Sequence, residues 1–225
     1  MKTIKRILGI ILIVAAVAVS LVIWQGYEMY SDAVAKVSIE EKTAEIMEQD
    51  HYTTYKELPE TYIKAIIAAE DRRFLYHRGF DIISTTRAAW CNFKSKEIVE
   101  GGSTITQQLG RIMYFSQEKK YSRKVAEVLV AGRIEELYEK EKILELYVNT
   151  IYFGSGYYSV YDASMGYFGK APSEMNDYEC TMLAGIPNAP SVYSPDVNPT
   201  LAEQRRQQVL VCMAEAGYIE PGEIE

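Results

Sequence analysis

Two glutamates stand at positions where helical periodicity predicts an apolar side chain. In the segment 60–74, Glu70 follows Ile63, Ile66 and Ile67 at the spacing i, i+3, i+4, i+7, which places all four on one helix face. A carboxylate in line with isoleucines is either paired or held in a pocket that raises its pKa, as a general base or acid requires. The alternative is that Glu70 lies at the frayed end of the helix and faces solvent.

The second glutamate, Glu127, lies in line with the apolar side chains that follow it in the segment 122–148. Arg123 and Lys124 precede it within one helical turn. These three residues could form a surface salt-bridge patch that contributes little to stability. They could equally form an anion clamp beside a carboxylate that binds a metal or steers charge. The pattern leaves both interpretations open.

A dense polar run, GGSTITQQL at 101–109, lies between the two glutamates. Gly101 and Gly102 permit a tight turn, and Thr104 followed by Gln107 fits a capping box, so we expect a helix to begin here. A well-capped helix is one sufficient explanation of the run. The other is anion binding, because the free N–H groups of a helix N-terminus, polar donors and the nearby Arg111 suit a phosphate or a sugar.

The elements that must position these residues are mainly helical. Hydrophobic periodicity predicts helices over 28–49, 60–74, 82–92, 104–114, 122–148, 160–168, 174–186 and 200–216. Gly and Pro separate these segments, and strand signals are few and short. The chain has 225 residues, which allows one domain of ordinary size plus an appendage. The sequence therefore predicts a mainly α protein with a single folded domain.

Composition and charge exclude several classes of protein. With 48% hydrophobic and 24% charged residues, the chain is not wholly disordered. Three Cys without a C-x-x-C pair, and two His, argue against a disulfide scaffold and a Cys/His zinc site. Residues 25–225 carry 21 Lys and Arg against 31 Asp and Glu, a net charge of −10. This acidic body argues against nucleic acid as a partner, and an anionic ligand would need a local cluster of cations.

The N-terminal segment predicts a membrane anchor. Ile7–Trp24 is uncharged and mostly apolar, and as a helix its 18 residues would span about 27 Å, close to a bilayer core of about 30 Å. Three cations precede this segment and acids follow it, which places the N-terminus in the cytoplasm and the remainder outside the cell membrane, as a single-pass protein. A cleaved signal peptide is the alternative, but Leu21–Trp24 after the alanines favours a retained anchor. The periodic segment 28–49 then predicts a stalk that leads away from the membrane.

Four motifs, taken together, resemble a known family. EDRRFLYHRGFD (70–81), GGSTITQQL (101–109), RKVAE (123–127) and KILELYVNTIYFG (142–154) occur in this order, and GIPNAPSVYSP (185–195) follows them. They closely resemble the peptidoglycan glycosyltransferases of glycosyltransferase family 51. This family includes the transglycosylase module of class A penicillin-binding proteins and the monofunctional transglycosylases. The resemblance covers residues 58–218.

The resemblance implies a fold and a division of the chain. The expected fold is a lysozyme-like head lobe with a smaller membrane-associated jaw lobe, preceded by one transmembrane helix. The division is 1–24, cytoplasmic tip and anchor; 25–57, stalk or linker; 58–218, glycosyltransferase domain; and 219–225, C-terminal tail. The segment 81–98, apolar with Arg87, Lys94 and Lys96, would form the jaw beside the lipid. An ordinary amphipathic helix on the core is the alternative for this segment.

The resemblance also implies a reaction, the polymerisation of lipid II into β-1,4-linked glycan strands with release of undecaprenyl pyrophosphate. Glu70 matches the family's catalytic base, which takes the proton from the 4-hydroxyl of the acceptor sugar, and Glu127 matches the second essential carboxylate. Arg123 and Lys124 match the motif near the donor pyrophosphate. An inverting single displacement needs one base for the nucleophile and positive charge at the leaving group, and these residue types supply both.

Further residues take their expected roles from the same motifs. The expected substrate-binding residues are Asp71, Phe74, His77, Ser103, Thr104, Gln107, Gln108, Arg111, Arg123 and Lys124. More structural roles are expected for Phe74 and Gly79, and architectural ones for Lys142 and Asn149. The family commonly uses a divalent cation, Mg²⁺ or Mn²⁺, although no separate metal cage is visible in the sequence. The expected partners are lipid II, the growing glycan strand, membrane lipid and cell-wall proteins such as transpeptidases, and not nucleic acid.

One stretch departs from the family pattern. After GGSTITQQL the family usually has x-Lys-Asn, where this chain has Gly110-Arg111-Ile112. Arg111 keeps the charge, but Lys and Arg are not equivalent at a tight phosphate site, and Ile112 lacks the amide. The departure bears on the rate rather than on the reaction class.

Two other functions and one formal motif match are compatible with parts of the sequence. A lysozyme-like glycan hydrolase would also use two carboxyl groups, but the Arg123-Lys124 pair and the anchor favour a lipid pyrophosphate substrate. A degenerate scaffold in a cell-wall complex would not need Glu70 and Glu127. Ser116-x-x-Lys119 is an S-x-x-K match without S-x-N or K-T-G, so we expect a monofunctional protein without a transpeptidase centre.

Overall fold

A computed structural model describes residues 2–95, 101–116, 120–220 and 222, so that Lys96, Lys119 and much of the predicted tail 219–225 lie outside it. Within that part of the chain every regular element is a helix, and strand pairing is limited to one isolated bridge between Arg78 and Phe80. The predicted mainly α fold is confirmed. The helices are α1 Lys2–Lys36, α2 Ile39–Met47, α3 Glu60–Glu70, α4 Ile82–Ser95, α5 Ile105–Tyr114, α6 Tyr121–Leu137, α7 Lys140–Val148, α8 Val160–Phe168, α9 Asp177–Gly185, α10 Pro190–Tyr193 and α11 Pro199–Glu215, with 3-10 turns η1 Tyr55–Glu57, η2 Phe74–Tyr76, η3 Pro172–Glu174 and η4 Ile186–Asn188.

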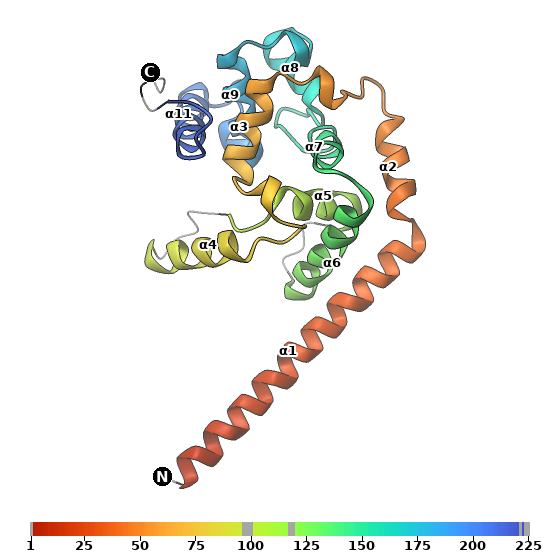
Figure 1. The fold of residues 1–225 in the computed structure, drawn as a ribbon, viewed down its shortest axis with the longest axis vertical. Helices are drawn as coiled ribbons and strands as arrows, with labels where there is room; N and C mark the ends of the chain where they lie inside the picture. Colours follow the sequence, from red (N-terminus) through yellow and green to blue (C-terminus); the bar gives the residue numbers. More distant parts are fainter. Residues whose placement is uncertain (1, 96–100, 117–119, 221, 223–225) are drawn as a thin grey trace.

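The body is formed by two groups of packed helices (Figure 1). One group consists of α3, α9 and α11, which contact one another, and the other consists of α5 packed against α6 and α7. Tyr62, Ile66, Leu109 and Tyr147 are fully buried between them. Burial of one large apolar side chain contributes about 1.5–3 kcal/mol, so this shared core fixes the position of α5 relative to α3.

The C-terminal end of α3 differs from the prediction. The helix predicted over 60–74 ends at Glu70, because Asp71 leaves the helical region with φ −157° and ψ 75° after its N–H has bonded to the Ile67 carbonyl. Glu70 is therefore the last helical residue. The chain then turns back through η2, which brings the rest of the EDRRFLYHRGFD motif underneath this helix end.

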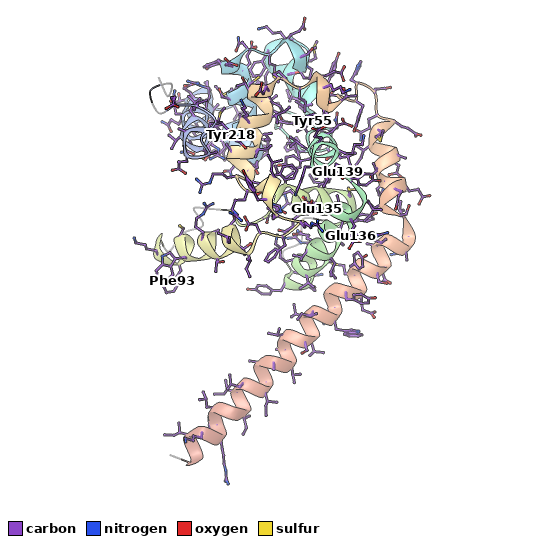
Figure 2. The ribbon with its side chains drawn as sticks, viewed as in Figure 1. Tyr55, Phe93, Glu135, Glu136, Glu139 and Tyr218 are labelled. Carbon is purple, nitrogen blue, oxygen red and sulfur yellow. The ribbon has the colours of Figure 1, made fainter. Side chains whose placement is uncertain are left out.

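The single helix predicted over 122–148 is two helices. Tyr138 and Glu139 adopt extended backbone conformations, which end α6 and begin α7. The break turns α7 so that its apolar side chains, Tyr147 among them, are buried against α5. Three acidic side chains gather around this connection, those of Glu135, Glu136 and Glu139 (Figure 2).

The N-terminal helix also has bounds other than those predicted. Instead of an anchor followed by a helix over 28–49, α1 runs without interruption to Lys36, and Ser38 then starts α2 with a capping box. One segment of α1, Ile4–Lys36, is long and apolar enough to cross a membrane, and an 18-residue stretch of it has a mean hydropathy of 3.0. Beyond the apolar stretch α1 packs on α6, and α2 buries Ile39 and Ile46 in the main core. The domain boundary at residue 58 stays a prediction.

Helix α4 stands away from the rest of the body, at the left of Figure 1. Its apolar side chains Ile82, Ile83, Trp90 and Phe93 are exposed, Phe93 to 79%, and the labelled Phe93 lies at the far tip of this helix in Figure 2. A helix lying on the core would bury such residues. Of the two interpretations of the segment 81–98, a projecting lobe is the one that the described residues 81–95 support, and its contact with lipid stays a prediction.

Candidate active site

A polar cleft of ≈ 400 Å³ lies where the end of α3, α4, the loop before α5, η4 and α11 meet. Its lining includes six of the expected catalytic and substrate-binding residues, Glu70, Asp71, Ser103, Thr104, Gln108 and Arg111. These residues lie up to 41 positions apart in the sequence. The packing of α3 against the start of α5 brings them together.

Glu70 occupies the cleft as a half-buried carboxylate. Its Oε2 accepts a hydrogen bond of 2.9 Å from Gln108 Nε2, while its Oε1 is buried without a partner among the described residues. Burial raises the pKa of Glu70, and the Gln108 bond together with the charges of Arg205 and Arg111 opposes that rise. The predicted partly desolvated carboxylate is confirmed, and the frayed, solvent-facing alternative is wrong.

Asp71 and His77 support the start of α5. Asp71 is buried, accepts hydrogen bonds from His77 Nε2 (2.9 Å to Oδ2), and accepts another from the N–H of Ile105 at 3.0 Å. The free N–H groups of a helix N-terminus need such acceptors. Phe74 is only 1% exposed and lies with its ring edge toward His77. Of these three predicted binding residues, Asp71 lines the cleft, whereas His77 and Phe74 do not.

The predicted capping box at the start of α5 is confirmed. Thr104 Oγ1 accepts from the N–H of Gln107 at 3.1 Å and donates to the carbonyl of Gly79 at 2.7 Å. Gly79 has φ +80°, and a Cβ there would lie 2.8 Å from the backbone of Ala131, so only glycine suits this position. The structural role that was expected for Gly79 thus has a physical cause. Thr104 and Gln107 are themselves buried.

Lys124 and Glu127 form a second cluster beside the same helix end. Lys124 Nζ donates to Ser103 Oγ at 2.7 Å, to Gln107 Oε1 at 3.0 Å and to Glu127 Oε2 at 3.2 Å. Arg123 pairs with the other oxygen of Glu127, which is only 2% exposed. Burial lowers the pKa of Lys124, and nearby cations add to the effect. A buried carboxylate held by two cations is not a surface patch, so that alternative is wrong.

The charge of Arg111 acts both on Glu70 and on Lys124. Its positive charge lowers the pKa of Glu70 on one side and that of Lys124 on the other. Among the described residues it has no salt bridge, so its charge remains available to a ligand. The glycine before it, Gly110, lies in a tight contact of α5 with α6, where a Cβ would approach Val130 Cγ1 to 2.9 Å.

Two residues of the site were not among those expected from the sequence, although Tyr147 lies within the motif KILELYVNTIYFG. Arg205 of α11 lines the cleft and faces Glu70, although it belongs to none of the four motifs. Tyr147 of α7 is fully buried and donates a hydrogen bond of 3.2 Å to Gln108 Oε1. Only tertiary packing brings either of them to Glu70. Lys142 and Asn149 have the architectural places expected, because they bind Tyr52 and Thr53 on the segment before α3.

The described residues contain no group of three or more His, Cys, Asp or Glu side chains that could hold a metal ion. Mg²⁺ is commonly bound by one or two carboxylates together with phosphate oxygens and water. A cage built from protein side chains therefore does not fit the described residues, and a divalent cation bound mainly through the phosphate oxygens of a substrate stays a prediction.

Comparison with known proteins places these residues in a family. Penicillin-binding protein 1A of Aquifex aeolicus is 45% identical over 174 residues, which are 77% of this chain and 24% of that protein. Penicillin-binding protein 1F of Bacillus subtilis is 42% identical over 163 residues, 72% of this chain and 23% of that protein. This chain thus spans about a quarter of their length. A Cupriavidus necator protein, provisionally named a transglycosylase, is 44% identical over 77% of this chain and 75% of its own length.

A crystal structure of penicillin-binding protein 1A from Haemophilus influenzae aligns with 77% of this chain and 16% of that chain, at 23% identity and a TM-score of 0.45. The family described as Transglycosylase matches residues 38–214. That match runs from the capping residue of α2 to the last turn of α11 and includes both glutamate clusters. The chain belongs to the transglycosylase family.

Proposed function

We propose that this protein is a membrane-anchored peptidoglycan glycosyltransferase that polymerises lipid II into β-1,4-linked glycan strands. The observation that carries the proposal is the Glu70 carboxylate, which is desolvated and lies in a cleft with Arg111 and Arg205 on its walls. A base beside fixed positive charge suits a reaction in which a hydroxyl attacks and an anion leaves.

In the proposed reaction, Glu70 acts on the acceptor sugar, and the cations at the other end of the site act on the leaving group of the donor. Glu70 takes the proton of the acceptor 4-hydroxyl while that oxygen bonds to the anomeric carbon of the donor from the face opposite the leaving group. The bond from this carbon to the pyrophosphate oxygen breaks, and the configuration inverts. Arg111 and the Lys124 cluster stabilise the negative charge that develops on undecaprenyl pyrophosphate. A divalent cation, when bound to the pyrophosphate, would add positive charge at the same end.

Two apolar parts of the structure, in α1 and in α4, suit a substrate that carries a lipid tail. The apolar portion of α1 would cross the membrane with the cationic N-terminus in the cytoplasm, according to the positive-inside rule. Helix α4 lines the cleft with Ser84 and Arg87, and its exposed apolar side chains would contact membrane lipid. The cleft would then face a donor whose pyrophosphate lies at the membrane surface. A transpeptidase that cross-links the product strands is the partner class that this activity needs.

Labelled lipid II and finished peptidoglycan, incubated separately with the protein, test the proposal. Polymer from lipid II supports it, fragments from peptidoglycan support a hydrolase, and neither product supports a scaffold. Glu70→Gln keeps the shape of the side chain but removes its basicity, and should lower the polymerisation rate by about 10²–10⁴-fold. Glu136→Gln, on the exposed side of α6, is the matched control. A Glu70→Gln protein that polymerises at the parent rate would refute the assignment.

A further inference from the structure

Among the described residues, the carboxylate of Glu70 accepts one hydrogen bond, which comes from the side-chain amide of Gln108. An amide can present either its NH₂ or its oxygen to a neighbour, since a half-turn exchanges the two. With Nε2 toward Glu70, Gln108 donates to the carboxylate and favours its ionised form. With Oε1 toward Glu70, two acceptors would face each other unless the carboxyl group were protonated. The orientation of Gln108 therefore affects the pH range over which Glu70 can act as a base.

The orientation of Gln108 depends on Tyr147. The Tyr147 hydroxyl is buried and donates to Gln108 Oε1 at 3.2 Å, while Gln108 Nε2 donates to Glu70 Oε2 at 2.9 Å. Turning the amide round would leave the phenol proton without its acceptor and would oppose two oxygens at Glu70 at the same time. A buried donor that loses its acceptor is costly. Building on the proposed function, we propose that Tyr147 is a positioning residue that holds Gln108 as the hydrogen-bond donor to Glu70.

The other groups that face Glu70 cannot replace this restraint. Asp71 adjoins it in the chain, and its negative charge favours the protonated form of Glu70. Arg111 from α5 and Arg205 from α11 favour the ionised form through their charge, but neither donates a hydrogen bond to the carboxylate among the described residues. Tyr62 of α3 is neutral, and its hydroxyl has no hydrogen-bond partner there.

Tyr147→Phe removes the hydroxyl and keeps the ring, so Gln108 becomes free to rotate. The rotated fraction favours protonated Glu70 and raises its pKa. The acidic limb of the pH profile of kcat/KM for lipid II should move to higher pH by about 0.5–1 unit, and activity should recover at higher pH. Tyr62→Phe is a matched control, because it also removes a fully buried phenol hydroxyl from the core, but one without a partner. It should leave the limb in place.

A double-variant experiment separates positioning from a general effect on packing. In a Gln108→Ala background the phenol has no amide to orient, so adding Tyr147→Phe should cause no further shift of the limb. A further shift there, or an equal shift in Tyr62→Phe, would overturn the proposal. An unchanged limb in Tyr147→Phe alone would overturn it as well.

The pKa of Glu70 can also be measured without turnover, by NMR titration of ¹³C-labelled glutamate carboxyl groups, with Glu70→Gln to assign the signal. This measurement distinguishes the present proposal from the proposed function. If the protein does not polymerise lipid II, yet Tyr147→Phe raises the Glu70 pKa and Tyr62→Phe does not, the proposed function fails and the positioning role stands. If the protein polymerises lipid II and the Glu70 pKa is the same in all three proteins, the positioning role fails.

Discussion

The contact of α1 with α6 predicts that a residue just beyond the apolar segment controls the stability of the protein. A Cβ built on Gly26 would lie 2.5 Å from Val125 Cβ and 2.7 Å from the carbonyl oxygen of Ser122. Gly26→Leu must therefore push α1 away from α6. Gly9 lies on the same helix with nothing within 4 Å of its Cβ position, so Gly9→Leu makes the same chemical change without the clash.

The expected magnitude follows from two opposing effects. Overpacking a tight contact costs about 1–3 kcal/mol. Replacing glycine inside a helix stabilises the helix by about 0.5–1 kcal/mol, because leucine has the better helix propensity. Gly26→Leu should thus lower the free energy of unfolding by about 1–2 kcal/mol, or the Tm by about 2–8 °C for a protein of this size. Gly9→Leu has only the favourable effect and should leave the Tm unchanged or slightly raised.

Thermal unfolding of both purified variants in the same detergent measures this difference. Polymerisation of lipid II should fall in Gly26→Leu as well, since Arg123 and Lys124 follow directly after the Ser122 contact on α6. Equal Tm values for the two variants would show that α1 does not pack on α6 at Gly26, and would refute the reasoning.

Three further predictions concern the cleft and its helices. Because the folded-state pKa of Glu70 is raised, its ionisation destabilises the fold as the pH rises above the ordinary glutamate value of about 4.3; Glu70→Gln should raise the Tm at pH 7, and thermal unfolding at pH 4 should show no such gain. Arg123→Ala should weaken binding of a moenomycin-like phosphoglycolipid inhibitor along with activity, measured by titration, whereas unchanged affinity would remove Arg123 from the pyrophosphate site. Gly110→Ala should lower the free energy of unfolding by about 1 kcal/mol through its clash with Val130, while Gly132→Ala on α6, with open space around it, should raise it by about 0.5–1 kcal/mol; the reverse order in denaturant titrations would contradict this packing.

Local patterns in the sequence were sufficient for part of this site. Glu70 was identifiable because it continues an isoleucine face, and the start of α5 because Thr104 and Gln107 have the spacing of a capping box. Both features depend only on neighbours within seven residues. The structure confirms both features, because the tertiary contacts around Glu70 and around the start of α5 are compatible with these local patterns.

Other features depend on contacts between distant segments, which a single sequence does not display. No Gly or Pro marks the break at Tyr138 and Glu139, which exists because α7 packs against α5. Arg205 belongs to a helix whose sequence suggests only an exposed polar face, and Tyr147 resembles any other core aromatic residue. Gly26 was predicted inside the stalk or linker 25–57, where nothing in the sequence indicates that a second helix packs against it.

The dense polar run at the start of α5 gains its meaning from these distant contacts. A helix that only filled a core would carry apolar residues there, yet Ser103 and Gln107 both accept from Lys124, while Gln108 donates to Glu70. One helix end is therefore bonded to the base on one side and to the cationic cluster on the other. Because buried polar groups must keep their partners, a displacement of this helix end disturbs both sides together. The two halves of the proposed reaction, proton removal and departure of the pyrophosphate, thus depend on the same first turn of α5.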